Sequence, residues 1–312
     1  MSRYREVPIS PEMREGEDMP ESKVVLHFFR HDRKENSRPE QDDKDVELTI
    51  EGRSNALQMG KLFPSKIETS WAAGSERIRS AHTALNRMAA QTGLLTPRMS
   101  YEQASRIVNE ELKVGKKVTM LPELGFSYEE KFYETVSERI RQGHFLEFVA
   151  NESDALALKQ QDTTSSTYSR AAANFASLIA REMRAANAWQ RVVREHPEKY
   201  ADQENTMERY LGSHQVILEN MYMKVVEKTH GREKLLQFIE NMRDEEGKAN
   251  GFDFHEGYTF TITNGTEGQK LMLEGIRGFE NMEVTPELLQ EIIDDAIHLD
   301  EAIEKSSPHS KE

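Results

Sequence analysis

Five polar side chains at separate places in the chain have the chemistry needed for phosphoryl transfer. They are Arg30, His31, Arg79, Glu123 and His214. Guanidinium groups hold phosphate oxygens in bidentate fashion, and a neutral imidazole can attack phosphorus. A carboxylic acid can protonate the departing oxygen. If these side chains meet in one crevice, they suit the transfer of a phosphoryl group through a histidine.

The segments that precede these side chains have strand-like composition. Lys23–Phe29 is apolar and rich in β-branched residues, as a buried strand is, and Ser70–Ser75 is a weaker strand. Two further segments of strand-like composition are Val118–Leu121 and Met207–Ser213. Ligands of a parallel sheet gather at the carboxyl ends of its strands. We therefore expect the five side chains to converge.

Helical segments alternate with the first strands. Thr49 is placed to cap a helix that ends near Leu62, and Glu76–Ala90 is typical of a second helix. Strand, helix, strand and helix in this order indicate a mostly parallel sheet covered by helices.

The middle of the chain is rich in helix formers. Ser127 and Glu130 form a candidate capping box, and residues 125–205 are expected to be a helical insertion. One long amphipathic helix is predicted there, with a core-facing stripe. The stripe consists of Tyr168, Phe175, Ile179, Met183, Ala186, Trp189 and Val193.

The C-terminal part returns to strands and closes with a helix. Tyr258–Thr263 is expected to pair with Gln269–Leu273, and Thr285 to cap a final helix that starts at Pro286. Residues 23–304 are predicted to form one domain, between a disordered arm (1–22) and a flexible tail (305–312).

Composition excludes several classes of protein. The 312 residues include 55 acidic and 41 basic ones, a net charge of −14, which disfavours nucleic acid and anionic membranes as partners. No apolar run approaches the roughly 18 residues of a membrane span, and the N-terminus lacks a signal-peptide core. Without cysteine there are no disulfides or thiolate sites. We expect a soluble cytoplasmic enzyme with a small-molecule substrate; the oligomeric state stays open.

Short motifs add a resemblance to a known family. In chain order they are FFRHDRKEN, DVELTIEGRSNAL, AAGSERIRSAHTA, LPELGF and YLGSHQVI. Together they resemble the histidine phosphatase superfamily, which includes the cofactor-dependent phosphoglycerate mutases. The positions that fit its helix-start and arginine motifs are Leu48, Thr49, Gly52, Ala56, Ser75, Arg79, Thr83 and Ala84. Ser80 and His82 depart from the pattern. The resemblance spans about residues 23–230, with the insertion similar in length and character only.

The resemblance implies a three-layer α/β/α sandwich, with a mostly parallel sheet and a helical insertion, and assigns roles to the five side chains. His31 would be the nucleophile, and Arg30 and Arg79 would clamp the phosphate. His214 would donate to a phosphate oxygen, and Glu123 would be the proton donor. Other acids compete for the last role, namely Glu110, Glu111, Glu129 and Glu130. No cofactor or metal is implied, because the arginines supply the countercharge.

One departure concerns the residue after the nucleophile. The family has glycine where this chain has Asp32, whose charge would repel substrate if it faced the phosphate and be harmless if it faced Arg33 or solvent. The polar loop 32–47, with Asp32, Arg33 and Asn36, is a candidate gate. His255 lacks a zinc-motif partner and is expected to be a supporting or rim residue.

The predicted function is hydrolysis of a phosphomonoester through phosphohistidine. A phosphoglycerate mutase-type phosphotransferase is an alternative, although Asp32, Arg33 and Lys34 stand where mutases have Gly-Glu-Ser. A catalytically impaired protein that binds a phosphate ligand is another. All of these interpretations require that the imidazoles of His31 and His214 lie within about ten ångströms of each other.

Overall fold

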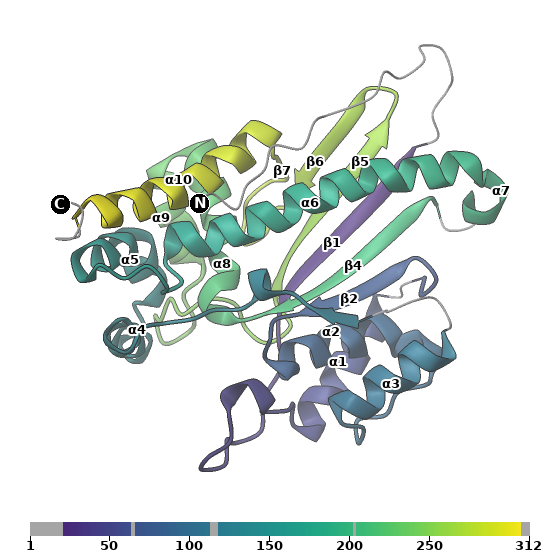
Figure 1. Ribbon diagram of the computed structural model, residues 1–312, viewed down its shortest axis with the longest axis horizontal. Helices are drawn as coiled ribbons and strands as arrows, with labels where there is room; N and C mark the ends of the chain where they lie inside the picture. The colour runs from purple at the N-terminus through teal and green to yellow at the C-terminus, as the bar shows by residue number, and fades with distance from the viewer. Residues whose placement is uncertain (1–20, 64–65, 113–117, 202–203, 307–312) are drawn as a thin grey trace.

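The parallel strands that the sequence predicts form one half of a mixed sheet. The computed structural model describes residues 21–63, 66–112, 118–201 and 204–306, and in these residues seven strands form one sheet in the order β3-β2-β4-β1-β5-β6-β7 (Figure 1). The strands are β1 (Ser22–Arg30), β2 (Ser70–Gly74), β3 (Val118–Met120), β4 (Thr206–Ser213), β5 (Gly257–Gly265), β6 (Gly268–Leu273) and β7 (Met282–Glu283). The first four run parallel, and β5, β6 and β7 are antiparallel.

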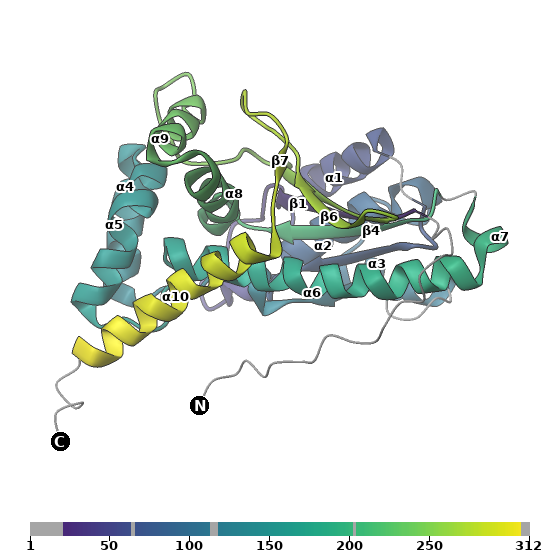
Figure 2. The same ribbon diagram turned by 90° about the horizontal axis from the view of Figure 1, so that it is seen from above.

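Helices separate the first five strands along the chain, whereas β5, β6 and β7 follow one another without a helix (Figures 1 and 2). The α-helices are α1 (Ile50–Leu62), α2 (Ile78–Ala89), α3 (Tyr101–Glu111), α4 (Glu130–Gln142), α5 (Phe145–Gln160), α6 (Tyr168–Glu195), α7 (Pro197–Tyr200), α8 (Gln215–His230), α9 (Arg232–Asn241) and α10 (Pro286–Ser306). The 3-10 helices are η1 (Asp43–Asp45), η2 (Ala90–Thr92) and η3 (Pro122–Leu124). Helices α4 to α7 lie between β3 and β4, in the stretch where the helical insertion is predicted.

Alternation along the strands divides the core into two layers. Phe28 packs with one buried cluster and Phe29 with the other, and Ala73 and Ala72 are divided in the same way. Successive side chains of a strand point to opposite faces of the sheet. Helix α2 contacts β2 and β4 on one side, and α6 and α8 contact β1 and β5 on the other. The predicted three-layer α/β/α architecture is confirmed.

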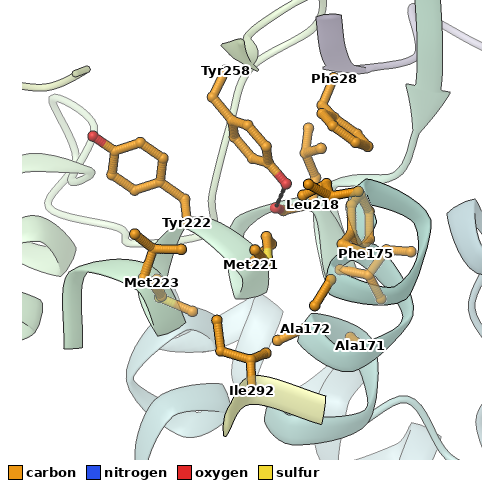
Figure 3. Close-up of a cluster of buried hydrophobic side chains, with 14 of the residues drawn as sticks. Phe28, Ala171, Ala172, Phe175, Leu218, Met221, Tyr222, Met223, Tyr258 and Ile292 are labelled. Atoms are coloured by element: carbon orange, nitrogen blue, oxygen red, sulfur yellow. Dashed lines mark hydrogen bonds between the residues drawn. The ribbon is translucent and has the colours of Figure 1, made fainter. Parts of the chain in front are cut away.

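The long amphipathic helix covers the second face. Every residue of its predicted stripe is buried. The ring centres of Phe175 in α6 and Phe28 in β1 lie 5.4 Å apart, and both belong to the buried cluster of Figure 3 that also contains Met221 of α8 and Ile292 of α10. Helix α6 therefore forms part of the core and joins the sheet to the helices around it.

Helix caps decide where several elements begin. Thr49 accepts a hydrogen bond from Gly52 N at 2.9 Å, and Leu288 N donates to Thr285 Oγ1 at 3.2 Å, so both predicted caps are confirmed. The predicted capping box of Ser127 and Glu130 is wrong. Helix α4 begins after Glu129 without a side-chain cap, because Ser127 Oγ donates to a distant carbonyl, Thr164 O.

The ends of the domain differ slightly from the prediction. Strand β1 already includes Ser22, and α10 continues to Ser306. The remaining residues of the predicted arm and tail, apart from Glu21, lie outside the described residues. No described helix combines the length and the apolar character that crossing a membrane requires.

Candidate active site

The carboxyl ends of three parallel strands bring the predicted side chains together. Arg30 of β1 stands beside Ser213 of β4, and Gly74 of β2 stands beside Gly212. The residues that follow these positions therefore share one edge of the sheet. The rings of His31 and His214 lie 5.0 Å apart, edge to face. The two imidazoles meet the spacing that the predicted chemistry requires.

A pocket of about 550 Å³ opens at this edge. Its walls are formed by Arg30, His31, Arg33, Lys34, Thr49, Glu51, Arg79, Phe126, His214, Gln215, Val216 and Phe254. Four of the five predicted side chains are among them. Four cations and one acid make the lining positive although the whole chain is negative. The pocket therefore attracts anions.

His31 presents an unprotonated nitrogen to Arg79. Its Nδ1 lies 2.6 Å from the carbonyl oxygen of Asp32, which can only accept, so Nδ1 carries the hydrogen. Nε2 keeps its lone pair and accepts from Arg79 Nε at 3.2 Å. Burial, followed by the charge of Arg79, lowers the pKa of His31 to about 3. The imidazole is therefore neutral between pH 5 and 8, as a nucleophile must be.

His214 is oriented by a serine of the neighbouring strand end. Its Nε2 lies 2.7 Å from Ser75 Oγ, and Ser80 Oγ lies 2.9 Å from the same oxygen. Its Nδ1 is buried and has no hydrogen-bond partner among the described residues. Burial, with the neighbouring His31 next in importance, lowers its pKa well below the ordinary value. Sequence reasoning did not assign this role to Ser75 and Ser80, although Ser75 lies within a quoted motif.

Arg79 reaches the strand ends because its helix packs unusually close to the sheet. A Cβ at Gly74 would lie 2.1 Å from Ala81 N, and one at Gly212 would lie 2.2 Å from Ser80 O. Only glycine permits this approach. The first turn of α2 therefore lies directly over β2 and β4. The Arg79 side chain is 4% exposed.

Arg30 lines the opposite part of the pocket. Its Nη1 donates to Phe252 O at 2.6 Å, and its guanidinium lies 4.3 Å from the centre of the Phe254 ring. Its buried Nε has no partner among the described residues. Burial lowers the pKa of Arg30, although Glu219 and other acids oppose the shift. This N–H is available to an anion, and Nδ1 of His214 is available too in the tautomer in which Nε2 accepts from Ser75 Oγ.

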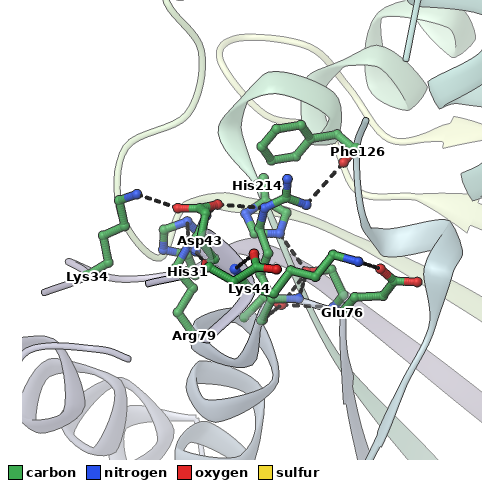
Figure 4. A network of polar contacts seen from close by, with 12 residues as sticks. His31, Lys34, Asp43, Lys44, Glu76, Arg79, Phe126 and His214 are labelled. Carbon is green, nitrogen blue, oxygen red and sulfur yellow. Dashed lines mark hydrogen bonds and ion pairs between the residues drawn. The ribbon is translucent and has the colours of Figure 1, made fainter. Parts of the chain in front are cut away.

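An acid that sequence reasoning did not single out lies against these cations. Asp43 of η1 accepts hydrogen bonds from Arg79 Nη2 at 2.9 Å and Arg77 Nε at 2.8 Å (Figure 4). Lys34 Nζ donates to its other carboxylate oxygen at 2.7 Å. No sequence signal distinguishes Asp43 from the other acids of the polar loop.

Asp32 is turned into the protein and away from the pocket. Its carboxylate is buried, accepts from Arg33 N and pairs with His255 Nε2. Although burial opposes it, these hydrogen bonds lower the pKa of Asp32. Its φ is not positive, so aspartate replaces the family's glycine without backbone strain. His255 is thus a supporting residue.

The predicted gate is only partly found at the pocket. Asp32 does not line it, because its side chain binds His255. Arg33 does line it and pairs with Glu51 at 3.2 Å, while Asn36 is exposed and absent from the lining. Of the three residues, Arg33 alone stays in a position to contact substrate.

Replacing Asp32 with glycine should destabilise the protein without removing the site. His255 would lose its buried partner, which costs about 1–3 kcal/mol in the free energy of unfolding. The carbonyl that accepts from His31 Nδ1 belongs to the backbone and would remain. Denaturant unfolding of Asp32→Gly and the isosteric Asp32→Asn measures the loss, which should be larger for glycine. An unfolding midpoint equal to that of the wild type would show that the pair contributes nothing.

Glu123 is the predicted residue that the structure does not bring to the pocket wall. Its Oε1 accepts from Arg181 Nη1 of α6 at 2.7 Å, and its buried Oε2 has no partner among the described residues. Phe126, three residues further on, does line the pocket. In this arrangement the carboxylate is held by α6.

Comparisons with known proteins give matches of fold. No family model and no curated protein matches the chain. A mycobacterial glucosyl-3-phosphoglycerate phosphatase is 13% identical, with a TM-score of 0.41, over 83% of this chain and 100% of its own. A putative alpha-ribazole-5'-P phosphatase from Escherichia coli is 13% identical, with a TM-score of 0.34, over 83% and 99%.

A putative phosphohistidine phosphatase SixA from Agrobacterium tumefaciens is also similar. It is 10% identical, with a TM-score of 0.30, over 77% of this chain and 90% of its own. At these values the matches describe similarity of fold alone, and the chemistry of this chain follows from its own residues. All three similar structures are named as phosphatases, two of them as putative ones.

Proposed function

We propose that the chain hydrolyses phosphomonoesters through a phosphohistidine formed on His31 Nε2, as a member of the histidine phosphatase superfamily. The observation that supports this most directly is the unprotonated Nε2 of His31, 3.2 Å from Arg79 Nε and facing His214. A nucleophile, a fixed cation and a second imidazole thus surround one position. A phosphoryl group fits that position.

In the first step the phosphoryl group passes to His31. Arg30, Arg79 and His214 hold its oxygens, and each charge-assisted hydrogen bond contributes about 1.5–3 kcal/mol. Nε2 attacks phosphorus from the side opposite the ester oxygen. The N–P bond forms as the ester P–O bond breaks, and the leaving oxygen takes a proton. The hydrogen bond from Nδ1 to Asp32 O stabilises the charge that develops on the imidazole.

In the second step water regenerates the enzyme. A water oxygen attacks phosphorus as the N–P bond breaks, and the carboxylate that gave its proton to the leaving oxygen in the first step takes one from the water. The products are inorganic phosphate and neutral His31. The pKa of His31, lowered to about 3, favours the neutral imidazole as the leaving group.

The proton donor in the first step stays a prediction, with Glu123 as the candidate. Its hydrogen bond to Arg181 holds it off the pocket wall, but catalytic contacts often tighten only when substrate is bound. Glu123→Gln should therefore lower kcat on an alkyl phosphate by about a hundredfold. Hydrolysis of p-nitrophenyl phosphate should change little, since nitrophenolate leaves without a proton. Equal effects on both substrates would remove Glu123 from the mechanism, and Arg181→Gln controls for loss of the ion pair.

Trapping the intermediate tests the proposed function directly. Purified protein is mixed with ³²P-labelled phosphomonoester and quenched in alkali, where phosphohistidine survives and phosphoserine esters are lost. We expect label on the peptide that contains His31, together with release of inorganic phosphate. Turnover without protein-bound label, or no turnover across pH 5–8, would overturn the proposal.

A further inference from the structure

The polar loop between β1 and α1 carries one carboxylate into the cluster of cations beside His31. Lys34, Arg77 and Arg79 converge on the side chain of Asp43 within 2.7–2.9 Å. The main chain adds a fourth contact, since Arg79 Nη1 donates to Asp43 O at 2.6 Å. Figure 4 shows Lys34 reaching this carboxylate, with His31, Arg79 and His214 drawn in the same network. No other described acid pairs with Arg79.

The contacts of Arg79 show that this carboxylate and a bound phosphoryl group need the same donors. Nε of Arg79 bonds His31 Nε2, and both terminal nitrogens bond Asp43. A phosphoryl group in reach of His31 Nε2 requires donors of Arg79. The N–H groups of the terminal nitrogens that bond Asp43 become available to it only if Asp43 withdraws.

Asp43 is ionised at neutral pH. Although burial opposes it, the hydrogen bonds from Arg79, Lys34 and Arg77 hold the pKa of its carboxyl well below the ordinary value. The charges that face it are the three cations themselves, and His31 beyond Arg79 is neutral. Asp43 therefore places a fixed negative charge against Arg79 before any ligand enters.

The loop can release this charge without disturbing the fold. Beyond η1 the chain is anchored by Val46 and Leu48, which are fully buried. The η1 turn itself is held by surface contacts, such as the ion pair of Lys44 with Glu76 at 2.7 Å. The Asp43 side chain is 41% exposed. Withdrawal of η1 would cost such surface contacts, which are individually weak, and also the bonds of Asp43 to Arg77 and Arg79, which a bound anion would replace.

We propose that Asp43 is a specificity-determining residue that occupies donors of Arg79 in the free protein and favours doubly charged ligands. The inference rests on the proposed function, whose substrates are phosphomonoester dianions. A dianion replaces one negative charge with two and gains attraction to Arg79 and Lys34. A phosphodiester or a carboxylate merely exchanges one charge for another, and it must also compete with a group tethered to the same chain.

Anion binding to Asp43→Asn tests this selection. Isothermal titration with inorganic phosphate at about pH 8, where it is a dianion, is compared with dimethyl phosphate, a monoanion. The variant should bind both more tightly, by about tenfold or more for dimethyl phosphate, so that the preference for the dianion shrinks. KM for p-nitrophenyl phosphate should fall several-fold.

Two further variants separate selection from a structural role. Asp45→Asn changes an exposed acid of the same turn and should behave as the wild type. Asp43→Glu keeps the charge and should preserve the preference for dianions. Unchanged or weaker binding by a folded Asp43→Asn, or loss of the preference in Asp43→Glu, would overturn the inference.

The outcome is independent of turnover. If the wild type hydrolyses substrate but Asp43→Asn does not bind anions more tightly, the inference alone fails. If Asp43→Asn binds phosphate more tightly and no protein turns over substrate, the proposed function alone fails, and Asp43 selects ligands of an anion-binding protein.

Discussion

Replacing His31 with alanine should lower the hydrolysis of p-nitrophenyl phosphate by at least about a thousandfold. The reason is that no other described side chain places an unprotonated nitrogen against Arg79, so the covalent step has no substitute. His31 is half-buried at a strand end, and a smaller side chain there should leave the fold intact. Steady-state kinetics beside a thermal unfolding curve separates lost chemistry from lost structure.

A matched control uses a histidine outside the pocket. His144 is exposed and precedes α5, so His144→Ala should keep full activity. Alkaline quenching of His31→Ala should leave no labelled protein. Equal rates for His31→Ala and the wild type would end the assignment of His31 as the nucleophile.

Replacing Arg79 with alanine should lower kcat/KM by about 10²–10³, whereas Arg33→Ala should change it only a few-fold. Arg79 is 4% exposed and bonds the nucleophile, so its donors act in a region where water is largely excluded. Arg33 is 57% exposed at the pocket rim and already pairs with Glu51. Screening by solvent reduces what that charge contributes.

A lysine at position 79 refines this comparison. Arg79→Lys keeps the charge but loses the forked donors, so it should recover only part of the loss. The inhibition constant of inorganic phosphate, measured on each protein, should rise from the wild type to Arg79→Lys and again to Arg79→Ala. Comparable losses in Arg79→Ala and Arg33→Ala would mean that the phosphate lies nearer the rim than we propose.

The convergence of the site follows from patterns that a sequence displays. Apolar runs predict the strands, and parallel strands place Arg30 and His31 beside His214 whatever the loops do. The long stripe of α6 is likewise visible as a period of 3.6 residues, and its burial follows from the same period. These features depend on short-range regularity, which is why they could be predicted.

Contacts made by irregular segments could not be predicted in this way. The polar loop contains several acids without periodicity, and only the path of η1 selects Asp43 to face Arg79. The orientation of Asp32 depends on His255, 223 residues further along the chain. Glu123 follows the motif, yet its partner Arg181 comes from α6, 58 residues further along the chain. Each of these outcomes is decided by tertiary packing.

The strand that carries the nucleophile is bonded to neighbours on both sides up to its last residue. His31 N donates to Ser213 O at 3.0 Å, and Arg30 N donates to Glu256 O at 2.9 Å. These main-chain hydrogen bonds hold the backbone of His31 in place on both sides, so the position of the reacting nitrogen is set once the protein has folded. The segment that contains Asp43 is held against Arg79 by side-chain contacts, and in our proposal it is the part that withdraws when a ligand binds. Substitutions in the loop that contains Asp43 would therefore change which compounds bind, while the end of β1 and the chemistry of His31 would stay the same.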